Sequence, residues 1–230
     1  MLKVSQLVKL SYDMVPGDPV PDGIPQAAVQ PYKDIPHDGG NVRILSTSSH
    51  TGTHVDSPNH MLEGAYDIFH FGIQDFLFDA PCLIDIPLGD DGLVHASHFE
   101  AMADEIRSCD YLLIRTGWAE IRREDGPRYA AHSPGFSLDA AEWIAANCPN
   151  IRAIGGDFLS FAAPMHVQEG VEAHKIMFRA QPEIQLYEDL YLPPVSELKN
   201  GDLCQILSVP WLFVGADSAP CTVYGIRKTD

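Results

Sequence analysis

The segment from His50 to His60 constrains this chain most, because it places four side chains that can bind a metal within eleven residues. Its β-branched residues, one glycine and one proline disfavour a helix, so the spacing is not that of a helical zinc site. In an extended segment, residues two apart point to the same side, so His54 and Asp56 converge. Gly52 lets the backbone turn and bring His50 to them.

Two imidazoles and a carboxylate form a ligand set for Zn²⁺, Mn²⁺ or Fe²⁺ that leaves positions open for water. Such an ion activates water and polarises a carbonyl, which is chemistry typical of a hydrolase. His60 is a candidate general acid or base, because imidazole titrates at about pH 6.5. The alternative is that these histidines only bond to backbone groups in a polar turn. The density of ligands around one glycine favours the metal site.

Two later residues, His174 and Glu188, are candidate ligands for a second ion. A helix from Val171 onward places His174 in its second turn, where it can project toward a metal held by the sheet. On the residues alone, ordinary surface positions are the alternative for both. His95 and His98 are also spaced like metal ligands, but no constrained turn with a carboxylate lies beside them, so we interpret them as surface residues.

Apolar strand-like runs and helical runs are mixed along the chain in an irregular order. This pattern predicts an α/β fold with a mixed sheet or small barrel, in one domain spanning residues 1–230. A region rich in proline and glycine, residues 15–36, is expected to form a long surface loop. The expected strands are 42–47, 82–86, 111–115, 151–154, 203–207 and 221–226, and the expected helices are 97–108, 138–147 and 171–180.

The charge and cysteine content limit the partners. A formal charge of −17 repels phosphate backbones and anionic lipid surfaces, so we expect neither nucleic acid nor a membrane as a partner. No apolar run approaches the roughly 18 residues of a membrane span, and the first ten residues lack a secretory signal pattern. Five widely spaced cysteines without a Cys-x-x-Cys pair indicate buried thiols. A cytoplasmic location is expected.

The segment from His50 to His60 resembles the His-x-Gly-Thr-His-x-Asp-x-Pro-x-His signature of the cyclase family, which includes bacterial kynurenine formamidases (arylformamidases) and isatin hydrolases. Further stretches are similar in the family's order, and together they extend the resemblance over almost the whole chain. These stretches are 10–11, 113–118, 156–157, 173–175, 188–190 and 215–220.

The resemblance implies a swivelling β/β/α fold, a homodimer or homotetramer, and one or two divalent ions, Zn²⁺ or Mn²⁺, that hydrolyse an amide, lactam or similar carbonyl bond in a small molecule. It implies that His60 is the catalytic acid or base, and that Asp56 bridges if two ions bind. Asp157 and Asp217 match recurrent positions where we expect hydrogen-bonding roles. The implied metal ligands are His50, His54, Asp56, His174 and Glu188.

Two departures from the family pattern bear on the substrate and the second ion. Kynurenine formamidases carry a tryptophan in an amino-terminal Pro-Val-Trp-Pro-Gly-Asp segment, whereas Val15 or Pro21 stands in its place here. The substrate therefore stays open among small amides, lactams and lactones. His174 and Glu188 are also two residues further apart than in the family, with residues 181–183 in the longer turn. A metal-assisted cyclase or dehydratase and a non-catalytic metal-binding protein are the alternative functions.

Overall fold

Nine strands form one mixed sheet in the computed structural model, which describes residues 3, 6–180 and 183–228. The sheet runs in the order β5-β12-β13-β4-β11-β10-β8-β6, and β1 pairs with β13. The strands are β1 (Leu7–Lys9), β4 (His54–Asp56), β5 (Leu77–Phe78), β6 (Pro81–Asp85), β8 (Tyr111–Arg115), β10 (Ala153–Gly156), β11 (Gln185–Glu188), β12 (Leu203–Pro210) and β13 (Ser218–Arg227).

Parallel and antiparallel pairings occur in the same sheet. Strands β6, β8, β10 and β11 are parallel neighbours, whereas β4 pairs antiparallel with both β11 and β13. The sheet curls into a nearly closed barrel whose interior is filled by apolar side chains such as Val55, Leu113 and Val223. The prediction of an α/β fold with a mixed sheet or small barrel is confirmed.

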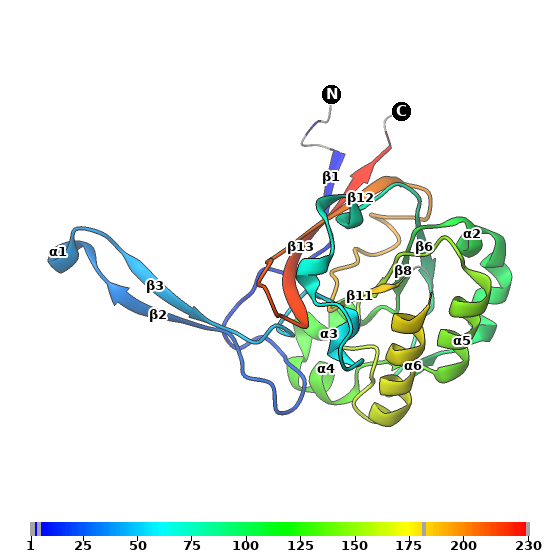
Figure 1. Cartoon of the computed structure of the whole chain (residues 1–230), viewed down its shortest axis with the longest axis horizontal. Helices are drawn as coiled ribbons and strands as arrows, with labels where there is room; N and C mark the ends of the chain where they lie inside the picture. Colours follow the sequence, from blue (N-terminus) through cyan, green and yellow to red (C-terminus); the bar gives the residue numbers. More distant parts are fainter. Residues whose placement is uncertain (1–2, 4–5, 181–182, 229–230) are drawn as a thin grey trace.

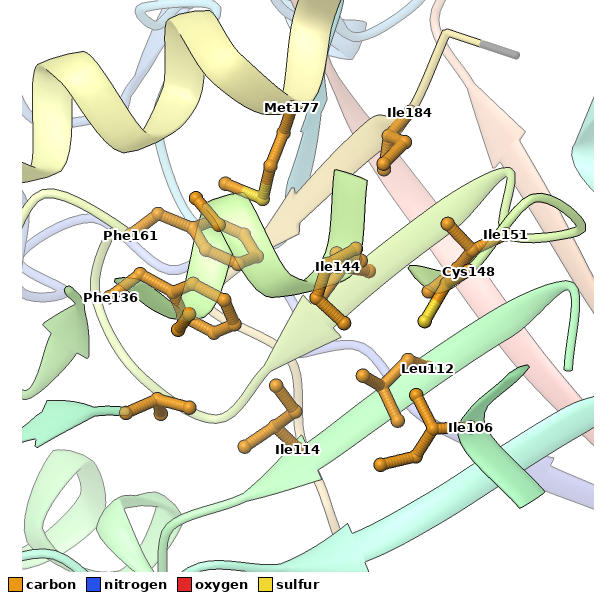
Figure 2. Packing of buried hydrophobic residues seen from close by; sticks show 14 of the residues in the cluster. Ile106, Leu112, Ile114, Phe136, Ile144, Cys148, Ile151, Phe161, Met177 and Ile184 are labelled. Atoms are coloured by element: carbon orange, nitrogen blue, oxygen red, sulfur yellow. The ribbon is translucent and has the colours of Figure 1, made fainter. Parts of the chain in front are cut away.

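Helices cover the outer face of the parallel strands (Figure 1). Leu112 and Ile114 of β8 belong there to one buried apolar cluster with Ile144 and Met177, which come from two different helices (Figure 2). Each such fully buried aliphatic side chain contributes about 1.5–3 kcal/mol relative to exposure. The helices are α2 (Ala103–Ser108), α3 (Trp118–Glu124), α4 (Gly126–His132), α5 (Leu138–Asn147) and α6 (Val167–Arg179).

The expected helix over 138–147 is confirmed as α5, and the Ser137 hydroxyl accepts a hydrogen bond from the Ala140 amide at its start. The helix expected from Val171 begins four residues earlier, at Val167. The helix expected over 97–108 is a 3₁₀ helix over Ala96–Met102 followed by α2. No helix in the described part of the chain is long and apolar enough to cross a membrane.

The expectation of a loop throughout residues 15–36 is wrong for its last part. Strand β2 (Ala28–Lys33) pairs with β3 (Val42–Ser46), and a short helix, α1 (Ile35–Asp38), joins them. Proline 31 is accommodated because the strand register shifts beside it, between Pro31 and Lys33. This hairpin, which we call the arm, projects away from the sheet (Figure 1).

A buried ion pair ties the long amino-terminal loop to the end of β11. Arg122 of α3 donates two hydrogen bonds to Asp189, at 2.7 and 2.8 Å, and the Tyr129 hydroxyl donates a third at 2.7 Å. Asp189 is 1% exposed. The guanidinium also stacks over the ring of Tyr12, 3.8 Å from its centroid, and reaches Asp18 at 3.3 Å.

We expect Arg122→Met to lower the free energy of unfolding by about 3–5 kcal/mol, because it leaves the buried Asp189 carboxylate unpaired. Urea denaturation with a metal chelator present measures this loss without a contribution from ion binding. Arg123→Met is the control, since the neighbouring arginine makes only surface pairs, and its expected effect is within about 0.5 kcal/mol. Equal losses in the two variants would contradict a structural role for the pair.

Candidate metal centre

Strand β4 presents two of the predicted ligands side by side. His54 and Asp56 point to one face of the strand, while Val55 between them points into the barrel core. Glu188 of β11 lies directly opposite His54 in the antiparallel register, so the two side chains share that face. The His54 Nε2 atom lies 3.3 Å from Glu188 Oε2 and 3.4 Å from Asp56 Oδ1.

His50 reaches the same point from the loop before β4. Gly52 adopts a left-handed φ of 67°, which allows the chain to reverse between the two histidines. The His50 Nδ1 atom is 3.1 Å from Asp56 Oδ1 and 3.3 Å from His54 Nε2. Two ring nitrogens at that distance, beside a carboxylate, face a common point.

Helix α6 brings His174 to the opposite side of this point. Its Nε2 atom lies 3.2 Å from Glu188 Oε1 and 4.0 Å from Asp56 Oδ2. Burial raises the pKa of Glu188, but the hydrogen bonds with His174 and His54 outweigh it and hold that pKa well below its usual value. The longer spacing between His174 and Glu188 therefore does not separate them, although residues 181–182 of the intervening turn lie outside the described residues.

The ring orientation of two ligands is set by backbone carbonyls. His54 Nδ1 is 2.8 Å from the carbonyl of Gly52, and His174 Nδ1 is 2.7 Å from the carbonyl of Gly170. A carbonyl oxygen only accepts, so each Nδ1 carries the proton. When these imidazoles are neutral, as metal binding requires, both Nε2 atoms carry lone pairs that point toward the Asp56 and Glu188 carboxylates.

Asp217 joins His50 to His60. Its Oδ2 atom is 2.9 Å from His50 Nε2 and 3.0 Å from His60 Nδ1, and the two rings lie 4.2 Å apart. Burial lowers the pKa of His50, but the hydrogen bond with Asp217 and the nearby Asp56 carboxylate outweigh it and raise that pKa to about 10. His50 and His60 in turn hold the pKa of Asp217 well below its usual range.

The carboxylate of Asp56 tests whether the site fits a cation. Asp56 is fully buried, and among the described residues neither of its oxygens has a partner in hydrogen-bond geometry. A buried carboxylate without a partner is costly, so this position is stable only with positive charge beside it. Two groups of potential metal ligands both include Asp56. Within each group, the ligand atoms lie within 4.8 Å of one another. The groups are His50, Asp56 and His60, and His54, Asp56 and Glu188.

All six predicted site residues therefore lie together, five as a donor set and His60 beside it, and we call these six residues the cluster. The donor chemistry fits one or two divalent ions, which these residues would hold. His60 is placed for either of two roles, since it belongs to one ligand group and also bonds to Asp217. His95 and His98, interpreted as surface residues, are exposed.

Two cavities lie beside the cluster. The larger has about 780 Å³ and reaches the cluster at Ser160, whose hydroxyl donates to Glu188 Oε1 at 2.9 Å. The smaller has about 390 Å³ and reaches it at Ser49 and Ser218, which contact Asp217 and His50, each at 3.1 Å.

Sequence reasoning missed the serines and the double contact of Asp217. Ser160 has no motif of its own, and it reaches Glu188 only because the loop after β10 folds over the end of β11. Asp217 lies in a stretch that resembles the family, which gave a signal for a hydrogen-bonding role. The resemblance did not identify the two side chains that Asp217 contacts, His60 and His50, which are 157 and 167 residues away in the chain.

Comparison with known proteins identifies the family of this chain. A family model described as "Putative cyclase" matches residues 8–163. Cyclase-like protein 1 of Arabidopsis thaliana is 31% identical over 183 residues, which cover 78% of this chain and 67% of that protein. The match to cyclase-like protein 1 of Oryza sativa subsp. japonica covers 62% of the length of that protein. Kynurenine formamidase of Bacillus cereus is 27% identical over 180 residues, covering 78% of this chain and 77% of that enzyme.

Solved structures share the fold. Isatin hydrolase A from Labrenzia aggregata, bound to benzyl benzoate, superposes with a TM-score of 0.78 at 20% identity, covering 96% of this chain and 94% of that one. A structure described as a potential metal-dependent hydrolase with cyclase activity gives 0.74 at 23% identity, covering 97% and 98%. The family match spans more than half of the chain, and it includes the run from His50 to His60. This chain belongs to the cyclase family.

Proposed function

We propose that this chain is a metal-dependent hydrolase that cleaves an amide, lactam or lactone bond in a small molecule. The observation that carries the proposal is the buried Asp56 carboxylate, which has no hydrogen-bond partner among the described residues and is shared by two groups of ligand atoms. A structural ion would need only one closed set of ligands. A shared carboxylate between partly open groups is typical of a catalytic centre with one or two ions.

The five donors His50, His54, Asp56, His174 and Glu188 would hold Zn²⁺ or Mn²⁺, since both accept imidazole and carboxylate ligands. When bound, such an ion supplies an activated water and polarises the carbonyl that is attacked.

His60 would move the proton to the leaving group. Asp217 holds its Nδ1 atom, which fixes the ring and leaves the other nitrogen for a substrate. The His60 side chain is 22% exposed and the His50 side chain 14%, so both can be approached from outside, whereas His54, His174 and Glu188 are closed off.

The larger cavity would receive the body of the substrate. Its wall is mostly aliphatic, with Asp22 and Ser160 as its polar members, and Pro21 of the amino-terminal loop belongs to it. Relatives bear the names kynurenine formamidase and isatin hydrolase, which suggest a carbon–nitrogen bond. Because none of the described residues that line this cavity is aromatic, we expect small aliphatic amides or lactams, and lactones, to be better substrates than aryl compounds. The lining residues are Val20, Pro21, Asp22, Ala130, Ala131, Leu159, Ser160, Ala162, Pro164 and Val167.

The proposal also includes a cytoplasmic location. The cysteines at positions 82, 109, 148, 204 and 221 are free thiols, and four of them are buried. Free buried thiols are usual in a reducing compartment.

Metal analysis together with a panel of formamides, lactams and lactones tests the function. We expect one or two ions per chain, loss of turnover on chelation, and recovery when Zn²⁺ or Mn²⁺ is returned. In heavy-oxygen water the product should gain one solvent oxygen, because hydrolysis incorporates water. Turnover without incorporation would instead indicate a cyclase or dehydratase. A tightly held ion with no turnover on any member of the panel would indicate a binding protein.

A further inference from the structure

Asp189 adopts a backbone conformation that few residues other than glycine accept. Its φ is 51°, in the left-handed region, and it directly follows Glu188, the last of the five donors along the chain. Aspartate and asparagine tolerate this region better than other side chains, but they still occupy it at a cost. A residue stays in such a conformation only where its surroundings hold it, and these positions cluster at functional sites.

The turn at Asp189 keeps two consecutive amides on the same neighbouring segment. The Asp189 amide donates to the Phe158 carbonyl at 2.9 Å, and the Leu190 amide donates to the Gly156 carbonyl, also at 2.9 Å. In an extended strand successive amides point to opposite edges, so both can reach one segment only where the backbone turns between them. Relaxation of Asp189 to an extended backbone would break this pairing immediately after Glu188.

The side chain of Asp189 locks this turn. Arg122 donates from Nε to one carboxylate oxygen and from Nη2 to the other, at 2.7 and 2.8 Å, and the Tyr129 hydroxyl donates at 2.7 Å. A bidentate pair of this kind fixes direction as well as distance. An apolar pair of similar volume often stabilises a fold equally well, because desolvation offsets much of the attraction between buried charges. The distinctive contribution of the pair is therefore the geometry that it imposes.

The contacts of Asp189 continue into two metal ligands. Its carbonyl accepts a hydrogen bond from the Thr53 hydroxyl at 2.5 Å, and Thr53 directly precedes His54. The segment after β10, which bonds the Asp189 amide, also holds Glu188, because the Ser160 hydroxyl donates to Glu188 Oε1 at 2.9 Å. A displacement of Asp189 would move Glu188 and His54, whose nearest ligand atoms lie 3.3 Å apart.

We propose that Asp189 is a positioning residue of the metal centre. Its left-handed backbone, held by Arg122 and Tyr129, aims the Glu188 carboxylate at the cluster and so sets the affinity for the ion. Loss of a group that orients a metal ligand weakens metal binding by about 10- to 100-fold. The inference rests on the divalent ion of the proposed function, but it does not require turnover, so metal binding alone tests it.

Calorimetric titration of the metal-free protein with Zn²⁺ and with Mn²⁺ measures the affinity. Asp189→Ala disfavours the left-handed backbone and removes the lock, so we expect its Kd to rise by about 10- to 100-fold. Asp189→Asn tolerates the conformation and keeps an acceptor for Arg122 and Tyr129, so it should recover part of the affinity. Circular dichroism establishes that each variant is folded at the temperature of the titration.

Ile106→Ala is the matched control for general loss of stability. It removes a fully buried side chain of α2 from the apolar cluster on the outer face of the sheet, so the variant is less stable. Its affinity for metal should equal that of the parent. Visible absorption of the Co²⁺-loaded proteins gives a second readout, because the bands report how the ligands are arranged around the ion. Asp189→Ala should change these bands, and Ile106→Ala should not.

Tyr129→Phe keeps the test available if Asp189→Ala does not fold. It removes one hydrogen bond to the same carboxylate, so it should raise the Kd by a smaller factor. Parent affinity and parent bands in the folded variants of Asp189 and Tyr129 would overturn the positioning role. Equal losses in Asp189→Ala and Ile106→Ala would also overturn it, as would an Asp189→Asn protein that binds metal no better than Asp189→Ala.

The outcomes for the parent separate this inference from the proposed function. A parent that binds metal with the expected dependence on Asp189, but hydrolyses no member of the panel, would count against the hydrolase and support the positioning role. A parent that binds no divalent ion would overturn both.

Discussion

An Asp56→Asn variant will lose its metal and its turnover together. Asparagine has the same shape but no charge, so it cannot supply the anionic oxygens that both ligand groups share. We expect turnover to fall by at least about a thousandfold, which corresponds to about 4 kcal/mol in the activation barrier. Metal analysis of the purified variant and rates on the best substrate of the panel measure the two losses.

The same variant has a second readout, which separates loss of the ion from loss of the fold. In the metal-free protein the Asp56 carboxylate is outside hydrogen-bond geometry and lies 3.1 Å from the His50 imidazole, so its replacement by a neutral amide of the same shape should lower the free energy of unfolding by no more than about 1–2 kcal/mol. Metal at about 100 times its dissociation constant should stabilise the parent by about 2.7 kcal/mol and the variant by much less. His98→Ala, at an exposed histidine that only caps a 3₁₀ helix, should match the parent in metal content and turnover. An Asp56→Asn protein with full metal content would contradict the assignment.

The half of the site that is local in sequence could be predicted. Extended backbone places His54 and Asp56 on one face whatever the rest of the chain does, and a glycine between two histidines permits the reversal that brings His50 back. The other half depends on strand register, which is set by pairings between distant segments. Glu188 stands opposite His54 because β4 inserts antiparallel between β11 and β13. No spacing rule contains that information, and only the resemblance pointed to it.

The arm could not be predicted for a different physical reason. Residues 28–33 are a short segment interrupted by a proline, which is typical of a loop. They form a strand because β3 supplies the pairing and the register shift accommodates Pro31. Strand β8, by contrast, is a mostly apolar run that is buried along its whole length, so composition and structure agree there.

A His60→Ala variant should keep its metal and lose most of its turnover. The remaining donors still surround the ion position, and Asp217 stays bonded to His50. Loss of a positioned acid or base lowers the rate by about 10²- to 10⁴-fold. Metal content per chain and steady-state rates measure the two effects, with His98→Ala again as the matched control on an exposed histidine.

Added imidazole and added metal separate the two roles that the geometry allows for His60. If His60 moves protons, free imidazole should bind in the space left by the removed ring and restore part of the rate, and extra metal should not. If His60 is instead a ligand of the group it forms with His50 and Asp56, the variant should lose up to one ion per chain, and excess metal rather than imidazole should recover activity. The contact of Asp217 with both rings favours the first outcome, because it orients His60 through one nitrogen and leaves the other for the substrate.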